Sequence, residues 1–149
     1  MHQARPTVIL PRLQDFAGQW RMSRVITDHR ARTTGQFDGM AAFTPDDGGL
    51  AYLEVGTLCL PGQPPFHAER RYLWRQRESA IDVHFDDGRF FHSVDPAHPT
   101  ACHWCDPDTY DVIYSFASWP EWSSTWDVAG PRKAYKMITS YSPTDPGGR

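Results

Sequence analysis

The stretch IDVHFDDGRFFHSV, residues 81–94, decides the fold class of this chain. Apolar and polar residues alternate on both sides of Asp87-Gly88, a pair typical of the tightest β-hairpin loops. With Asp87-Gly88 as a two-residue loop, Val83 lies opposite His92, and alternate side chains share one face. That face carries Ile81, Val83, Phe85, Phe90, His92 and Val94. The stretch therefore predicts an antiparallel hairpin whose buried face is apolar except for one histidine.

The same period of two recurs along most of the chain. Alternating segments such as Phe37–Phe43, Tyr52–Leu58 and Tyr110–Phe116 are separated by turn signals about every 8–12 residues, as in antiparallel sandwiches and barrels. The one helical segment we expect is a short turn at Leu13–Ala17, because 13 prolines disfavour long helices. Closure into a barrel would remove two exposed sheet edges that few lysines protect. We predict an all-β fold, a single antiparallel β-barrel of about 8–10 strands.

Composition and charge narrow the class of protein further. The chain has 149 residues, 40% of them hydrophobic and 13% aromatic, which is enough for one core without disulfides or metal. We place the barrel domain at 13–142, an N-terminal arm at 1–12 and a flexible tail at 143–149. A net charge of -3 disfavours nucleic acid as a partner, and no apolar run is long enough to cross a membrane. The lack of a signal-peptide core and the odd number of cysteines indicate a cytoplasmic protein. We expect it to be a monomer or a homodimer.

Two resemblances narrow the fold prediction. Gly18-Gln19-Trp20, just after the expected helical turn, resembles the opening of the calycin superfamily, which includes lipocalins, fatty-acid-binding proteins and nitrobindin-like haem barrels. In lipocalins this tryptophan plugs one end of the barrel and packs under a basic side chain from the last strand. The resemblance therefore implies that Trp20 is buried and contacts Arg132, as structural residues at the barrel end.

Residues 13–142 as a whole resemble the family catalogued as domain of unknown function 6314, which is itself calycin-like. The matching pieces are Gly18–Trp20, Tyr52–Gly56, Arg71–Trp74, Asp87–His92, His103–Tyr110 and Gly130–Tyr135. This resemblance implies a calycin-like barrel and assigns no activity.

The candidate ligand-binding residues are those whose strand faces we assign to the barrel lumen, together with a histidine at its rim. They are Phe37, Tyr52, Glu54, Arg70, Tyr72, His92, His103, Tyr110, Tyr114 and Tyr135. Such aromatic walls with a few convergent polar groups are typical of small-molecule sites. Glu54 and Arg70 would form a buried pair or a ligand anchor, unless their strands turn these charges to solvent. His92 would hold a ligand or form a hydrogen bond to a neighbouring Tyr or Glu, and the tyrosines could equally be ordinary core packing.

Cys102-His103-Trp104-Cys105 resembles half of a zinc site. A structural zinc site needs four ligands, and Cys59 is the one other cysteine in the chain. A redox pair would lie near a βαβ unit, which the pattern does not predict. We therefore assign no metal here and leave open a structural turn or the rim of a pocket.

Four hypotheses for function follow from this sequence. The first is a small-molecule-binding barrel with an aromatic lumen, its ligand and cofactor unknown. The second is a cofactor-independent isomerase, cyclase or hydrolase using His92, Glu54, Tyr110 and Arg132 as acid–base groups. The third is a haem-binding barrel with His92 or His103 as the axial ligand. The fourth is a structural protein whose barrel is filled by its own side chains.

Overall fold

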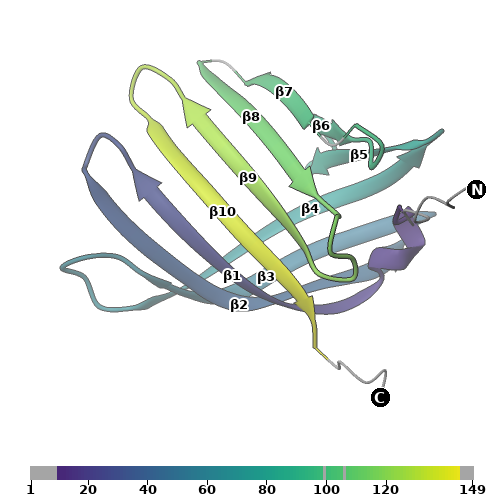
Figure 1. Cartoon of the computed structure of the whole chain (residues 1–149), viewed down its shortest axis with the longest axis horizontal. Helices are drawn as coiled ribbons and strands as arrows, with labels where there is room; N and C mark the ends of the chain where they lie inside the picture. Colours follow the sequence, from purple (N-terminus) through teal and green to yellow (C-terminus); the bar gives the residue numbers. More distant parts are fainter. Residues whose placement is uncertain (1–9, 99, 106, 145–149) are drawn as a thin grey trace, which may run out of the picture.

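The computed structural model describes residues 10–98, 100–105 and 107–144, and in them ten antiparallel strands form one curled sheet (Figure 1). The order of the strands across the sheet is β6-β5-β4-β3-β2-β1-β10-β9-β8-β7. The elements are η1 (Leu13–Phe16), β1 (Gly18–Asp28), β2 (Thr33–Asp46), β3 (Gly49–Cys59), β4 (Phe66–Arg77), β5 (Ala80–Phe85), β6 (Phe90–Val94), β7 (Thr100–Cys105), β8 (Asp108–Ser115), β9 (Trp122–Ala129) and β10 (Ala134–Pro143).

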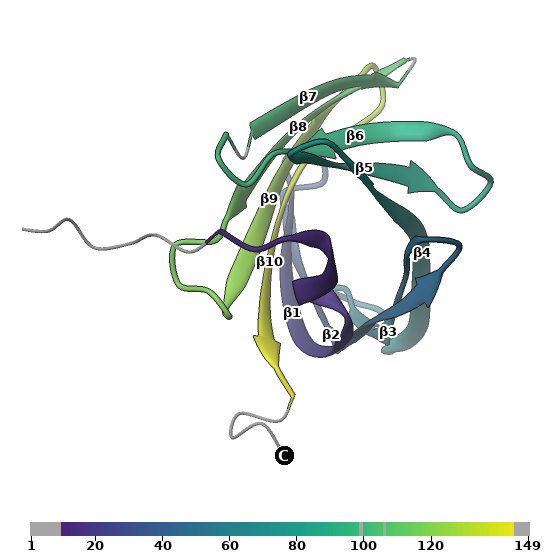
Figure 2. The ribbon, with the colours of Figure 1, turned by 90° about the vertical axis from the view of Figure 1, so that its right-hand side faces the viewer.

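The sheet curls until its two edge strands, β6 and β7, lie side by side (Figure 2). No backbone ladder joins these two strands within the described part of the chain, so the barrel is nearly closed. This confirms the prediction of an all-β antiparallel barrel with one short helical turn, which is the 3-10 turn η1. The predicted arm 1–12 and tail 143–149 fall mostly outside the described residues, so the domain bounds stay predictions.

The β5–β6 hairpin differs from its prediction by one residue. The expected pairing of Val83 with His92 is present, but the next pair is His84 with Phe90, so Phe91 is an extra residue in β6. The loop is longer than Asp87-Gly88, and the bulge at Phe91 restores the register beyond it. Phe91 is consequently buried at 1% exposure, whereas Phe90, expected on the buried face, is 49% exposed.

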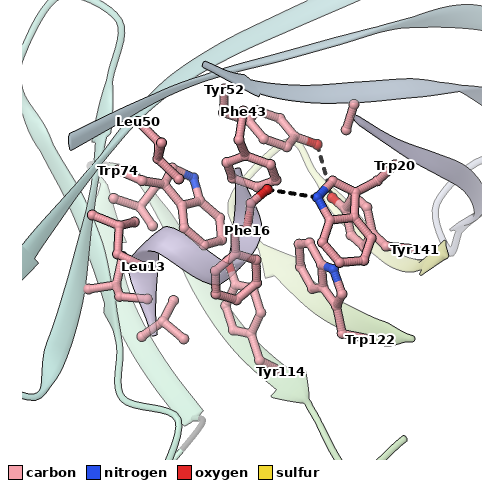
Figure 3. Close-up of a cluster of buried hydrophobic side chains, with 14 of the residues drawn as sticks. Leu13, Phe16, Trp20, Phe43, Leu50, Tyr52, Trp74, Tyr114, Trp122 and Tyr141 are labelled. Carbon is pink, nitrogen blue, oxygen red and sulfur yellow. Dashed lines mark hydrogen bonds between the residues drawn. The ribbon is translucent and has the colours of Figure 1, made fainter. Parts of the chain in front are cut away.

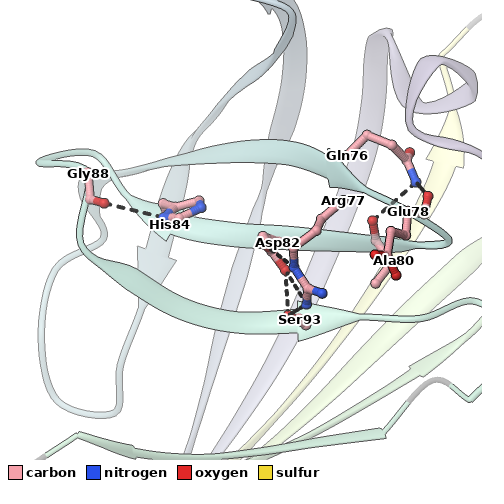
Figure 4. A network of polar contacts seen from close by, with 8 residues as sticks. All are labelled: Gln76, Arg77, Glu78, Ala80, Asp82, His84, Gly88 and Ser93. Atoms are coloured by element: carbon pink, nitrogen blue, oxygen red, sulfur yellow. Dashed lines mark hydrogen bonds and ion pairs between the residues drawn. The ribbon is translucent and has the colours of Figure 1, made fainter.

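A polar network on the outside of the barrel holds this hairpin against β4 (Figure 4). Asp82 accepts hydrogen bonds from Arg77 Nε at 2.8 Å and from Ser93 Oγ at 2.6 Å. These three residues come from β4, β5 and β6, so the network fixes the strands that carry Val83 and His92 on their inner faces.

Aromatic side chains close one end of the barrel around η1 (Figure 3). Phe16 has no exposed surface, and its ring lies 5.2 Å from Trp122 and 5.3 Å from Trp74, centroid to centroid. Trp20, 5% exposed, donates a hydrogen bond from Nε1 to the Phe16 carbonyl at 2.9 Å. Trp20 is thus buried at a plugged barrel end, as the lipocalin resemblance implied.

The contact expected between Trp20 and Arg132 is absent, because the two residues lie at opposite ends of the barrel. β10 runs antiparallel to β1, so Trp20 pairs with Pro143 while Tyr135 pairs with Asp28. Arg132 precedes β10 and is exposed, about 26 Å along the strand direction from Trp20. The ring that covers Trp20 is instead Trp119, at 5.5 Å between centroids.

Two glycines let β2 and β3 approach each other closely on the inner face. Gly39 and Gly56 pair directly across the two strands. A Cβ on Gly39 would collide with the Val55 carbonyl, and one on Gly56 with the Asp38 carbonyl. Only glycine allows this close backbone approach, which is typical of tight bends in barrel strands.

Candidate functional site

A small pocket lies in the lumen, between the aromatic plug and the opposite end of the barrel. Its lining residues come from eight strands and are Arg24, Tyr52, Glu54, Arg70, Tyr72, Trp74, Val83, His92, Tyr114, Trp122, Ser124, Trp126 and Tyr141. The free volume at its centre is about 20 Å³, room for a water molecule or two. Sites that bury drug-sized molecules measure about 300–1,000 Å³, so a larger ligand enters only if lining side chains move.

The floor of the pocket is a buried ion pair between Arg24 on β1 and Glu54 on β3. Arg24 Nη1 and Nη2 donate to the two Glu54 carboxylate oxygens at 2.6 Å and 2.9 Å, and Arg24 Nε donates to Thr139 Oγ1 at 2.7 Å. Arg24 is 6% exposed and Glu54 2%. Burial alone would raise the pKa of Glu54, but the hydrogen bonds and charge of Arg24 keep that pKa below its ordinary value. Glu54 is therefore a carboxylate at neutral pH, fully engaged by its partners.

Two tyrosines extend this cluster. The Tyr52 hydroxyl donates to Glu54 Oε1 at 2.6 Å and lies 2.9 Å from the Tyr141 hydroxyl. Burial is the main cause that raises the pKa of Tyr141 to about 12 and that of Tyr52 well above 10.0. Both phenols are thus neutral hydrogen-bonding groups across the physiological pH range.

His92 reaches the lumen from β6. Its Nε2 lies 2.9 Å from the Tyr114 hydroxyl of β8, and the residue is 2% exposed. The expected inward position is confirmed, and the partner is a tyrosine, one of the two kinds that the sequence analysis left open. Burial raises the pKa of Tyr114 well above its ordinary value, so this phenol stays protonated.

The pocket reaches solvent beside Arg70 on β4. Arg70 is exposed, while Tyr72 and Trp126 next to it are half-buried. The Tyr72 and Trp126 rings meet edge to face across the lumen, 6.4 Å between centroids. Burial raises the pKa of Tyr72 and the charge of Arg70 opposes this, because the guanidinium lies close to the phenol. We call Arg70, Tyr72 and Trp126 the mouth of the pocket.

Six of the ten predicted ligand-binding residues line this pocket. They are Tyr52, Glu54, Arg70, Tyr72, His92 and Tyr114. The inward orientation of Glu54 settles the question of its strand face, but its expected partner Arg70 is wrong. Arg70 is opposite Glu54 in register, yet Glu54 binds Arg24 two strands away. The inner residues of β2 between them, Gly39 and Ala41, are small and leave Arg24 room to reach across.

Three predicted residues do not line the pocket, and one lies outside the described side chains. Phe37 is buried beneath Arg24, with the guanidinium carbon 5.4 Å from its ring centroid. Tyr110 on β8 and Tyr135 on β10 lie nearer the end opposite the plug. Both pair with Val128, on the β9 strand between them. The backbone of His103 belongs to β7, but its side chain and those of Cys102 and Cys105 are not described.

Sequence reasoning missed seven lining residues as site residues. They are Arg24, Trp74, Val83, Trp122, Ser124, Trp126 and Tyr141. The position of Arg24 could have been inferred from the sequence, because Arg24 shares a strand face with Trp20 and Met22, which are apolar. A charged residue in that position requires a buried partner.

Two other classes of site can be compared with the geometry. Of the proposed acid–base set, only Glu54 and His92 line the pocket, since Tyr110 and Arg132 lie elsewhere. No group of three or more metal-ligating side chains occurs within the described residues.

None of the helical segments described is long and apolar enough to cross a membrane.

The barrel is similar to a solved structure of another protein. The S-type phycobiliprotein lyase CPES from Guillardia theta superimposes with a TM-score of 0.62 over 89% of this chain and 90% of that chain, at 7% sequence identity. At this identity the likeness shows a shared fold. No curated protein matches the sequence. A family model matches residues 16–143, and the chain therefore belongs to the family of unknown function DUF6314.

Proposed function

We propose that this protein binds a small, partly polar aromatic molecule in the lumen pocket, entering through the mouth formed by Arg70, Tyr72 and Trp126. The ligand replaces the contact between the Tyr72 and Trp126 rings, which close the entrance from opposite walls. Both side chains are half-buried, so their movement costs less burial than that of the plug residues.

The observation that carries the proposal is the charged floor of an otherwise aromatic lumen. A buried ion pair is often no more stable than apolar side chains of the same volume, and replacement has stabilised proteins by about 1–4 kcal/mol. Apolar side chains in place of Arg24, Glu54 and the tyrosines bound to them would therefore make the barrel at least as stable. A site that must orient a polar group inside an apolar cavity, in contrast, needs such polar residues.

The shared fold with a phycobiliprotein lyase supports the same proposal. That protein is named for acting on a phycobiliprotein, so this barrel architecture serves a role other than a filled scaffold there. The proposal for this chain is limited to binding, since the groups considered for acid–base chemistry are not assembled in its pocket.

The haem alternative has less support from the residues described. Of its two expected axial ligands, His92 has its Nε2 engaged by the Tyr114 hydroxyl, and the side chain of His103 is not described.

The test uses phenylnaphthylamine, a neutral aromatic probe that fluoresces on leaving water. Ser124 lines the pocket from β9, whereas its neighbour Ser123 points to the outer face of the same strand. We expect the wild type and Ser123→Leu to bind the probe, and Ser124→Leu to lose it because leucine fills the pocket. Thermal unfolding establishes that both variants are folded. Absence of binding to the wild type, or equal binding by both variants, would refute the proposal.

A further inference from the structure

The pocket carries one positive charge in excess. Its arginine and carboxylate lining residues are Arg24, Glu54 and Arg70. Glu54 is neutralised by Arg24 through two hydrogen bonds and accepts a third from Tyr52. Arg70 takes part in none of the ion pairs found among the described residues. The one charge at the pocket that is not already matched is therefore a cation.

The hydrogen-bonding groups of the pocket point to the same kind of ligand. The sole carboxylate in the lining has both oxygens occupied, so a cationic ligand would find no free partner there. Donors are in surplus, because Trp122 lines the pocket at 4% exposure and its Nε1–H has no acceptor within the described structure. A buried donor is normally satisfied, which makes an acceptor on a bound molecule the natural partner.

The walls determine the rest of the ligand. Tyr72 and Trp126 at the mouth and Trp74 deeper in the pocket offer ring faces and edges. Flat aromatic groups pack well against such walls. Arginine is also the side chain best suited to a planar carboxylate, through two parallel hydrogen bonds.

We infer that the pocket selects an aromatic anion, a ring system bearing a carboxylate or a similar acidic group, and that Arg70 binds the acidic group. This inference rests on the proposed function. Arg70 acts as a specificity-determining residue at the mouth, and the Arg24–Glu54 pair acts as the neutral floor beneath it. Because Arg70 is exposed, solvent screens its charge, and the preference for the anion is moderate rather than absolute.

Two probes that differ in one acidic group provide the test. Anilinonaphthalene sulfonate is phenylnaphthylamine with an added sulfonate, so the ratio of their affinities reports the recognition of the anion alone. We expect the wild type to bind the sulfonate about tenfold more tightly than the neutral probe, as for one charge-assisted hydrogen-bonding contact. Arg70→Gln should abolish this preference, because it lowers the affinity for the sulfonate far more than the affinity for the neutral probe.

Arg71→Gln is the matched control. Arg71 is the next residue on β4, is exposed on the outer face and lies 3.7 Å from Glu69. Its replacement removes the same charge from the same strand and should leave both affinities unchanged. Equal affinity of the wild type for the two probes, or an unchanged preference in Arg70→Gln, would overturn the inference. Failure of the proposed function is distinguishable, because then the neutral probe does not bind either.

Discussion

Removing one partner of the buried Arg24–Glu54 pair should destabilise the barrel strongly. Arg24→Met leaves the Glu54 carboxylate at 2% exposure with Tyr52 as its remaining hydrogen-bond donor. Two hydrogen bonds and the countercharge are lost, and breaking such pairs costs about 3–5 kcal/mol. That is a large part of the total stability of an ordinary domain, about 5–15 kcal/mol.

The double variant Arg24→Met/Glu54→Met separates stability from function. With both charges removed, the unpaired carboxylate is gone, and the free energy of unfolding should return to the wild-type value or exceed it by about 1–4 kcal/mol. The assay is urea unfolding followed by tryptophan fluorescence, with the wild type and all three variants in one thermodynamic cycle.

The same cycle has a functional readout. The double variant should be folded and yet bind the aromatic probes differently from the wild type, because its pocket floor has become apolar. An Arg24→Met variant within about 1 kcal/mol of the wild type would refute the buried-pair reasoning. A stable double variant with unchanged probe affinities would show that the charges are not kept for binding.

Four further predictions follow from the same contacts. The pKa of Glu54 is lower in the folded than in the unfolded chain, so stability should decline as pH falls below about 4.3, and Glu54→Gln should flatten this decline in urea titrations at pH 3–5. The pKa of Tyr141 is raised to about 12, so stability should be lost as pH rises from about 10, and phenol absorbance should show a tyrosine that ionises only near unfolding. Trp20→Ala should lower the free energy of unfolding by about 3–5 kcal/mol and Arg132→Ala by less than about 0.5 kcal/mol. Equal losses in the two variants would contradict the separation of Trp20 from Arg132. Gly39→Ala should lower the thermal unfolding midpoint, because a Cβ there would collide with the Val55 carbonyl, and a loss smaller than that of Gly48→Ala, where space is open but φ is +81°, would contradict this.

The fold could be predicted because alternation along each strand reports directly which face is buried. Tyr52 and Glu54 share a strand face, and the structure places both in the lumen. The β5–β6 hairpin shows where this logic ends. The loop is longer than Asp87-Gly88, and a compensating bulge places Phe91 instead of Phe90 on the buried face. No local pattern shows which of two adjacent phenylalanines is buried.

The site was harder to predict because it depends on which strands meet across the barrel. Register places Arg70 opposite Glu54, and a pair between them is the natural inference from adjacent strands. The actual partner, Arg24, lies on β1, and its reach depends on small residues in the intervening strand. Trp20 and Arg132 failed as a pair for the same reason, since the direction of β10 relative to β1 separates them by the length of the barrel.

The most direct test of lumen binding is nuclear magnetic resonance of the tryptophan indole N–H groups during titration with phenylnaphthylamine. Trp74, Trp122 and Trp126 line the pocket, whereas Trp119 covers the plug and does not. Single Trp→Phe variants assign the signals. The account predicts that the probe shifts the Trp126 signal most, with Trp74 and Trp122 following and Trp119 little affected. Shifts confined to Trp119 and Trp20, or no shift at saturating probe, would contradict it.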